Sequence, residues 1–272
     1  MMFDLNGKVL IVTGAGSGMG RELTLQLVQK GVKVAACDIN AETLAETKSL
    51  VSSPDLVKTY VLDVSDASKV AGFPKTVKAD FGNLHGIINN AGIIQPFVKF
   101  MELTEKSIDR VMNINFYGVI NLTRAVMLEL DTTTDTFVAN VSSMGGFLPV
   151  PGQGIYGASK AAVKLFTEAL YAETMGTSVH VSVIFPGAIA TNISTNSMDD
   201  KPKAAAPAPD SSAAKHKTTS ADVAASIIIK GIEKGKLKIF VGSDSKMMDK
   251  LYRLMPVKSI DMMANLIKKM TK

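Results

Sequence analysis

A tyrosine and a lysine stand four residues apart in the stretch GIYGASKAAV, as Tyr156 and Lys160. On a helix this spacing places both side chains on one face, one above the other. The two groups have ordinary pKa values of about 10 and 10.4, so neither exchanges protons readily at neutral pH. An ammonium group beside the phenol would lower the pKa of the phenol, because an opposite charge stabilises the phenolate. The pair therefore indicates either a general acid–base group or a solvated aromatic–lysine pair.

A second candidate is the glycine-rich turn TGAGSGMG at residues 13–20. Glycine permits positive φ and lets a backbone approach a ligand closely, and a helix start offers N–H groups to an anion. A plain tight turn would look similar. Here the turn follows the first strand of the chain, and Asp38 ends the second strand about the right distance downstream. We therefore predict a dinucleotide site with contacts from Gly14, Ser17, Gly18, Met19 and Gly20.

Asp38 also predicts which dinucleotide would bind. A carboxylate at this position accepts hydrogen bonds from ribose hydroxyls and repels a 2′-phosphate. Its neighbour Ile39, a further candidate contact, is uncharged, and Arg21 is the one nearby cation that would act against this preference. We expect NAD rather than NADP.

The elements that must position these residues alternate regularly along the chain. Apolar runs predict strands, and helical spacing of apolar residues predicts the segments between them. The pattern predicts a single-domain α/β fold of the Rossmann type, a doubly wound parallel seven-stranded sheet with helices on both faces. The expected strands are 8–14, 32–38, 57–63, 86–92, 136–143, 180–187 and 236–242, and the expected helices are 18–30, 41–51, 66–80, 104–128, 155–175 and 221–234.

Composition narrows the functional classes. The chain has 272 residues, of which 46% are hydrophobic and 20% charged, as in a soluble globular protein. The net charge is +5 without an aromatic and basic stripe, which argues against nucleic-acid binding. The single cysteine, Cys37, excludes an intramolecular disulfide. We find no signal peptide and no apolar run long enough to span a bilayer, so we expect a cytoplasmic protein.

Several motifs in order carry a family resemblance. T-G-x-x-x-G-x-G at residues 13–20, NNAG at 89–92 and Y-x-x-x-K at 156–160 resemble the short-chain dehydrogenase/reductase family over about residues 6–242. The resemblance implies an NAD-dependent oxidoreductase that interconverts a secondary alcohol and a ketone by hydride transfer. Tyr156 would then be the general acid or base, assisted by Lys160 and by the positive nicotinamide ring.

The resemblance also implies two further catalytic residues. Ser143, rather than the adjacent Ser142, would hydrogen-bond the substrate oxygen, and Ser142 would be a structural residue of the strand. Asn115, rather than Asn113, would hold a water that links Lys160 to solvent. The implied cofactor contacts are Asp63 and Val64 beside the adenine, Asn90, Ala91 and Gly92 beneath the cofactor, and Tyr156, Lys160, Pro186, Gly187, Ile189 and Thr191 around the nicotinamide.

Two segments depart from the regular alternation. Residues 192–219, rich in proline, alanine and small polar residues, predict a substrate-loop lid inserted into a catalytic domain at 1–243, with a disordered connector as the alternative. Residues 244–272 predict a basic helical tail, in which Ile260, Met263, Ile267 and Met270 recur along one side. We expect this tail to pack on the domain or on a neighbouring subunit. Docking on a membrane surface is the alternative.

The expected substrate is a bulky apolar small molecule. Segments 94–100 and 144–150 are mainly apolar and predict a pocket for a steroid, a retinoid, a long-chain ketone or an aryl ketone. A 3-oxoacyl thioester reductase and a non-catalytic dinucleotide sensor are the alternatives. The three histidines, His85, His180 and His216, form no ligand cluster, so we expect no metal and exclude a metal-dependent hydrolase. Apolar residues on several faces of 104–128 and 155–175 predict a homo-oligomer, a dimer or a tetramer.

Overall fold

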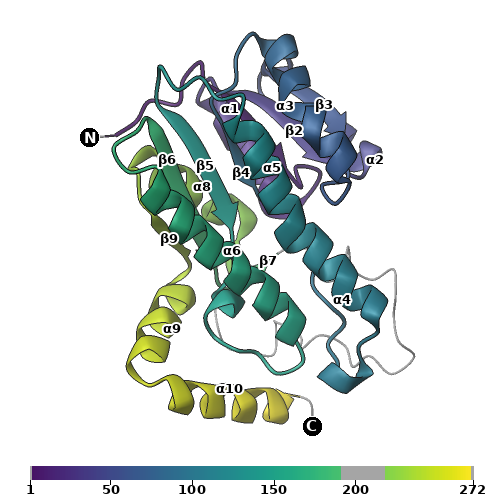
Figure 1. Ribbon diagram of the computed structural model, residues 1–272, viewed down its shortest axis with the longest axis vertical. Coiled ribbons are helices and arrows are strands. Elements are labelled where there is room, and N and C mark those ends of the chain that lie inside the picture. The colour runs from purple at the N-terminus through teal and green to yellow at the C-terminus, as the bar shows by residue number, and fades with distance from the viewer. Residues whose placement is uncertain (1, 191–217, 271–272) are drawn as a thin grey trace.

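A computed structural model of the chain describes residues 2–190 and 218–270. Seven parallel strands form one sheet in the order β3-β2-β1-β4-β5-β6-β9 (Figure 1). The strands are β1 (Val9–Thr13), β2 (Lys33–Asp38), β3 (Val57–Val61), β4 (Gly86–Asn89), β5 (Thr136–Val141), β6 (Val179–Pro186) and β9 (Lys238–Val241). The chain starts at β1, runs outward to β3 and returns to β4 on the other side of β1, which creates a crevice at their carboxyl ends. The predicted sheet is confirmed, and all seven expected strands are present.

Helices cover both faces because alternate strand residues point to opposite sides. Along β1, Leu10 and Val12 belong to one buried cluster, and Val9 and Ile11 belong to the other. Figure 1 shows α5 and α6 crossing in front of the strands. One cluster includes side chains of α1 (Gly18–Gln29), α2 (Ala41–Leu50) and α8 (Ala221–Glu233), and the other those of α3 (Ala67–Phe81), α5 (Gly118–Met127) and α6 (Gly154–Glu173).

The long helix expected over 104–128 is interrupted. It consists of α4 (Glu105–Met112), a π-helical turn over Asn113–Tyr117, and α5. A π turn inserts an extra residue into an α-helix and is frequently found at functional sites. Its centre here is Asn115, whose side chain is fully buried. The sequence prediction of one uninterrupted helix was therefore wrong at its middle.

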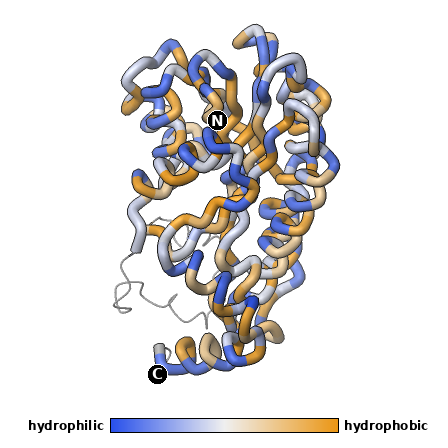
Figure 2. Tube along the Cα trace, turned by 90° about the vertical axis from the view of Figure 1, so that its left-hand side faces the viewer, coloured by the Kyte–Doolittle hydropathy of each residue, from blue (hydrophilic) through white to orange (hydrophobic). Residues whose placement is uncertain are grey.

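The tail forms two helices rather than one. These are α9 (Ser243–Leu254) and α10 (Pro256–Met270), and the break falls at Met255, since a residue before proline avoids helical backbone angles. Figures 1 and 2 both place α10 at the end of the molecule opposite α2 and α3. The predicted apolar side of the tail is only partly buried, because Met263 is 7% exposed whereas Ile260 is 41% exposed. Among the helices that the structure describes, none is long and apolar enough to cross a bilayer.

A small parallel pair of strands, β7 (Ile189–Ala190) and β8 (Thr219–Ser220), stands beside the main sheet. Thr191, His216 and most of the predicted lid at 192–219 lie outside the described residues, which resume at residue 218. The backbone at 219–220 leads directly into α8, which packs against α1 on one face of the sheet.

Candidate active site

A large cavity of about 430 Å³ opens at the carboxyl ends of the strands. It brings together residues that the sequence spreads from position 14 to position 189. The predicted cofactor contacts that line it are Gly14, Ser17, Gly18, Met19, Gly20, Asp38, Ile39, Asp63, Val64, Asn90, Ala91, Gly92, Tyr156, Lys160, Pro186, Gly187 and Ile189. Ser143 lines the same cavity, whereas Asn115 is buried behind it.

The glycine turn is locked to the end of β4. Gly14 has φ +66°, and a Cβ there would come within 2.9 Å of the Asn90 amide nitrogen. That nitrogen donates to the Thr13 carbonyl at 2.9 Å. The Thr13 hydroxyl oxygen in turn accepts from the backbone N–H groups of Asn90 and Ala91, at 3.0 Å each. These contacts explain why the NNAG segment accompanies the turn.

The turn delivers the chain into the N-terminus of α1. The helix begins at Gly18, which has φ +50°, and a Cβ on Gly20 would collide with the Gly14 carbonyl. The positive end of the helix dipole and its first N–H groups thus border the cavity at two glycines, Gly18 and Gly20. A diphosphate group fits these donors, and the cavity is long enough to connect it to both Asp38 and Tyr156. The residues present therefore fit a nicotinamide dinucleotide.

Asp38 is held at the edge of this cavity by backbone donors. Its carboxylate accepts from the Gly16 N–H at 2.9 Å and from the Asn40 N–H at 3.1 Å. Arg21 is engaged elsewhere, since its guanidinium donates to Glu46 and to the Gly16 carbonyl, each at 2.6 Å. That contact with Arg21 lowers the pKa of Glu46.

Ser143, Tyr156 and Lys160 meet where β5 and α6 face each other. Ser143 follows β5, and its hydroxyl accepts from the Gly145 N–H at 3.1 Å. The same hydroxyl lies close enough to the Tyr156 phenol to lower the pKa of that phenol. The Lys160 ammonium donates to the Val141 carbonyl at 3.0 Å. The Ser142 hydroxyl donates to the Lys160 carbonyl at 2.7 Å, which connects the end of the strand to the helix.

Asn115 reaches this group from the π turn. Its side-chain oxygen accepts from the Ile93 N–H and its nitrogen donates to the Ile93 carbonyl, both at 2.9 Å. The same nitrogen donates to the Ser159 hydroxyl at 3.1 Å. A Cβ on Gly92 would lie 3.2 Å from both the Asn115 oxygen and the Lys160 ammonium, so Gly92 is the spacer between them.

Burial sets the acidity of the central pair. Burial raises the pKa of Tyr156, although the nearby Ser143 hydroxyl acts in the opposite direction. It lowers the pKa of Lys160 to about 8, because the charged form loses its hydration. The sequence-based expectation of a phenol made acidic by Lys160 thus does not describe this structure, in which desolvation is the larger effect.

The lowered pKa of Lys160 predicts a pH-dependent change in stability. In the unfolded chain Lys160 keeps its proton up to its ordinary pKa of 10.5, and in the folded chain it releases the proton near 8. The folded state therefore binds fewer protons between these values, and the free energy of unfolding rises with pH there, by at most about 3 kcal/mol from this group. Urea unfolding of the wild type and of Lys160→Met at pH 7.5 and 10 measures the effect. The free energy of unfolding of the wild type, relative to that of Lys160→Met, should be higher at pH 10 than at pH 7.5. A difference that does not change with pH would contradict the prediction.

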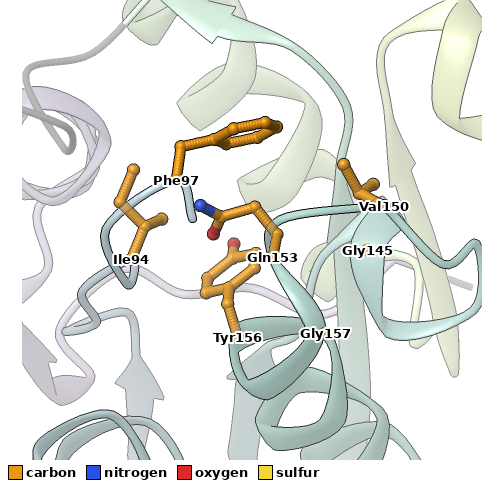
Figure 3. Close-up of a pocket in the computed structure, with 7 residues that line it drawn as sticks. All are labelled: Ile94, Phe97, Gly145, Val150, Gln153, Tyr156 and Gly157. Atoms are coloured by element: carbon orange, nitrogen blue, oxygen red, sulfur yellow. The ribbon is translucent and has the colours of Figure 1, made fainter. Parts of the chain in front are cut away.

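A second, apolar cavity of about 210 Å³ adjoins the first (Figure 3). The residues that line it are Ile94, Phe97, Gly145, Val150, Gln153, Tyr156 and Gly157. Of the residues that the structure describes, Tyr156 alone lines both this cavity and the large one. Its phenol therefore stands between the space that fits a dinucleotide and a separate apolar space.

A family model described as short chain dehydrogenase matches residues 8–202 of the chain. The chain belongs to the short-chain dehydrogenase/reductase family. This family member is 36% identical over 261 residues to the putative oxidoreductase SadH of Mycobacterium tuberculosis, covering 93% of each chain. It is also 36% identical over 188 residues to a 3-oxoacyl-(acyl-carrier-protein) reductase, FabG, of Thermotoga maritima, covering 69% of this chain and 76% of that one.

Solved structures agree with the fold. A short-chain dehydrogenase/reductase from Burkholderia phymatum in complex with NAD superposes with a TM-score of 0.78 at 26% identity, covering 88% of this chain and 90% of the other. The present short-chain dehydrogenase/reductase is thus an oxidoreductase of a family that binds nicotinamide dinucleotides.

Sequence reasoning missed several residues of the large cavity. Ser142, expected to be a structural residue of the strand, also lines it, and so do five residues that were not among the predicted contacts: Leu62, Ile93, Arg110, Ile114 and Val141. Arg110 and Ile114 are four residues apart in a segment that is helical up to Met112, and this spacing was the signal available for them. The others are apolar residues next to predicted contacts, without a chemical signal of their own.

Proposed function

We propose that this short-chain dehydrogenase/reductase transfers hydride between NAD(H) and an apolar secondary alcohol or ketone. The observation that supports the proposal most directly is the position of Tyr156, which lines both cavities, with Ser143 beside it in the larger one. A substrate carbonyl in the apolar cavity would meet this phenol at the boundary with the cofactor. The bound nicotinamide supplies the hydride acceptor or donor.

The side chains of the site transfer the proton that the substrate oxygen gains or loses. In ketone reduction Tyr156 donates its phenolic proton to the substrate oxygen while the Ser143 hydroxyl holds that oxygen in place. In alcohol oxidation Tyr156 accepts the proton. Burial raises the pKa of Tyr156 in this structure, so the phenolate needs cationic neighbours, and Lys160 and the positive ring of the oxidised cofactor are the candidates.

Lys160 and Asn115 would connect this proton to solvent. The Lys160 pKa of about 8 places proton exchange on that amine close to neutral pH. Asn115 and Lys160 are neighbours across Gly92, in agreement with a shared water between them. The amide of Asn115 is fixed by both polar groups of Ile93, so it would present a constant geometry to that water.

NAD is the proposed cofactor rather than NADP. The Asp38 carboxylate is fixed by two backbone N–H donors at the rim of the cavity, where a 2′-phosphate would meet its negative charge. Arg21, the cation expected to oppose this preference, is paired with Glu46. Both observations favour a ribose with free hydroxyl groups.

A homo-oligomer remains the proposed assembly. The helices α5 and α6 and the residues next to them carry large apolar side chains that this chain leaves exposed. Leu128 is 79% exposed and Leu165 is 67% exposed. Burying such residues against a second copy would remove them from water.

Consumption of NADH in the presence of ketones tests the proposed function. The panel consists of cyclohexanone, acetophenone, a long-chain methyl ketone and a 3-oxoacyl thioester, each assayed with NADH and with NADPH. We expect turnover of at least one apolar ketone with NADH. Turnover of the thioester alone would favour the reductase alternative, and oxidation of neither cofactor with any ketone would contradict the proposal.

A further inference from the structure

Gln153 carries a buried polar atom that the proposed reaction does not use. The residue is 8% exposed, precedes α6 and lines the apolar cavity beside Tyr156. Its side-chain oxygen accepts no hydrogen bond from any residue that the structure describes. A buried acceptor without a partner costs free energy, so such an atom calls for an explanation.

The orientation of this amide is determined by its other end. The Gln153 side-chain nitrogen donates to the backbone carbonyl of Gln95 at 3.1 Å. Turning the amide over would place two acceptor oxygens against each other, because a carbonyl cannot donate. The oxygen must therefore face away from Gln95, and Figure 3 shows the amide directed into the space above the Tyr156 hydroxyl.

Gln95 shows what a purely structural glutamine looks like in the same region. It is 3% exposed, and both ends of its amide are satisfied. Its oxygen accepts from the Tyr156 N–H at 2.9 Å, and its nitrogen donates to the Gly152 carbonyl at 2.9 Å. Gln95 thus fixes the loop after β4 to the start of α6, and Gln153 needs only one of its two polar groups for the same connection.

The rest of the apolar cavity offers no competing acceptor side chain. Apart from Tyr156 and Gln153, its lining consists of glycines and the apolar side chains Ile94, Phe97 and Val150. A cavity of about 150 Å³ holds a benzene ring, so the 210 Å³ here accommodates a substituted six-membered ring.

From these contacts we infer that Gln153 selects substrates that carry a second hydrogen-bond donor. The inference rests on the proposed function and adds the substrate class. The substrate is a ring-sized apolar alcohol or ketone with a hydroxyl or N–H group on the same framework. Its reacting oxygen lies at Tyr156 and Ser143, and the additional donor binds the side-chain oxygen of Gln153. Gln153 is a specificity-determining residue that takes no part in proton or hydride transfer.

Oxidation of matched ring alcohols with NAD tests this inference. The 1,2-, 1,3- and 1,4-cyclohexanediols each carry a second hydroxyl where the corresponding 2-, 3- and 4-methylcyclohexanols carry a methyl group of similar size. We expect kcat/KM for at least one diol to exceed that of its methyl counterpart by about tenfold or more, because the methyl group leaves the acceptor unpaired. The position of the preferred diol reports how far the second donor lies from the reacting carbon.

Two variants separate recognition from packing. Gln153→Met keeps the chain length and removes the acceptor, so the preference for the diol should fall to near unity. Val150→Ala changes the same cavity without touching the acceptor and should alter both alcohols of a pair alike. The ratio within each pair is the readout, since general damage to the fold lowers both rates together.

The outcomes distinguish this inference from the proposed function. Equal rates for diols and methylcyclohexanols in the wild type overturn the inference and leave the proposed function standing, and this comparison needs no variant. A preference that persists in Gln153→Met also overturns it. Failure to oxidise any of these alcohols, together with failure on the ketone panel, contradicts the proposed function and the inference with it.

Discussion

Replacement of Tyr156 by phenylalanine is expected to lower turnover by about 10²–10⁴-fold, the range over which positioned acid–base groups act. The change removes one oxygen from a side chain that α6 holds at the boundary between the two cavities. Since the ring itself remains, the affinity for NADH should stay within about threefold of the wild type. Steady-state kcat with the best ketone and fluorescence titration with NADH measure the two quantities separately.

Tyr117→Phe is the matched control for that experiment. Tyr117 is 52% exposed on the π turn next to α5 and lines neither cavity. Its hydroxyl can be removed without effect on turnover. A Tyr156→Phe protein that kept more than about a tenth of the wild-type rate would show that another group moves the proton.

Residue types and spacing were sufficient to predict the sheet and most of the large cavity. A parallel strand buried on both faces is a short apolar run, and the carboxyl ends of such strands collect on one edge of the sheet. Asp38 is the last residue of β2, and Asn90 directly follows β4. Because these two strands flank β1, the strand order alone brings both residues to the glycine turn. Here a local pattern and the overall topology predict the same site.

The interruption at Asn115 was not predictable from periodicity. Apolar residues continue through 113–117 at nearly helical spacing, whereas the π turn depends on tertiary contacts. Asn115 exchanges two hydrogen bonds with the backbone of Ile93, in a segment 22 residues earlier in the chain. Such a contact favours the wide turn because it places the amide deeper in the protein than a regular helix would.

Burial explains why the electrostatics were predicted less well than the positions. The chain shows that Lys160 stands one turn after Tyr156, but not that both are desolvated. Desolvation raises the pKa of a phenol and lowers that of an amine, so the two pKa values, which are nearly equal in water, move apart. The sequence does not reveal the unpaired side-chain oxygen of Gln153 for the same reason, since only the packing of the folded chain shows that this oxygen lacks a hydrogen-bond partner.

The second large effect concerns Asp38 and the choice of cofactor. We expect the wild type to prefer NADH over NADPH by about 10²–10³-fold in kcat/KM. Two unit charges about 4 Å apart near a protein surface repel by about 4 kcal/mol, which is equivalent to about 10³-fold, and solvent screening reduces that value. Asp38→Asn removes the charge and keeps an oxygen that can accept from the Gly16 N–H. The preference should therefore fall to within about tenfold of unity, mainly through faster use of NADPH.

Asp63→Asn is the matched control, because Asp63 is the other carboxylate that lines the large cavity. Its oxygen accepts from the N–H and the hydroxyl of Ser65, so it is engaged in its own turn. Neutralising it should change the rates with both cofactors by the same factor. Raising the salt concentration provides an independent check, since repulsion at an exposed rim weakens with ionic strength while a steric exclusion does not. An Asp38→Asn protein that kept the full preference for NADH at both salt concentrations would show that shape, and not the charge of Asp38, excludes the 2′-phosphate.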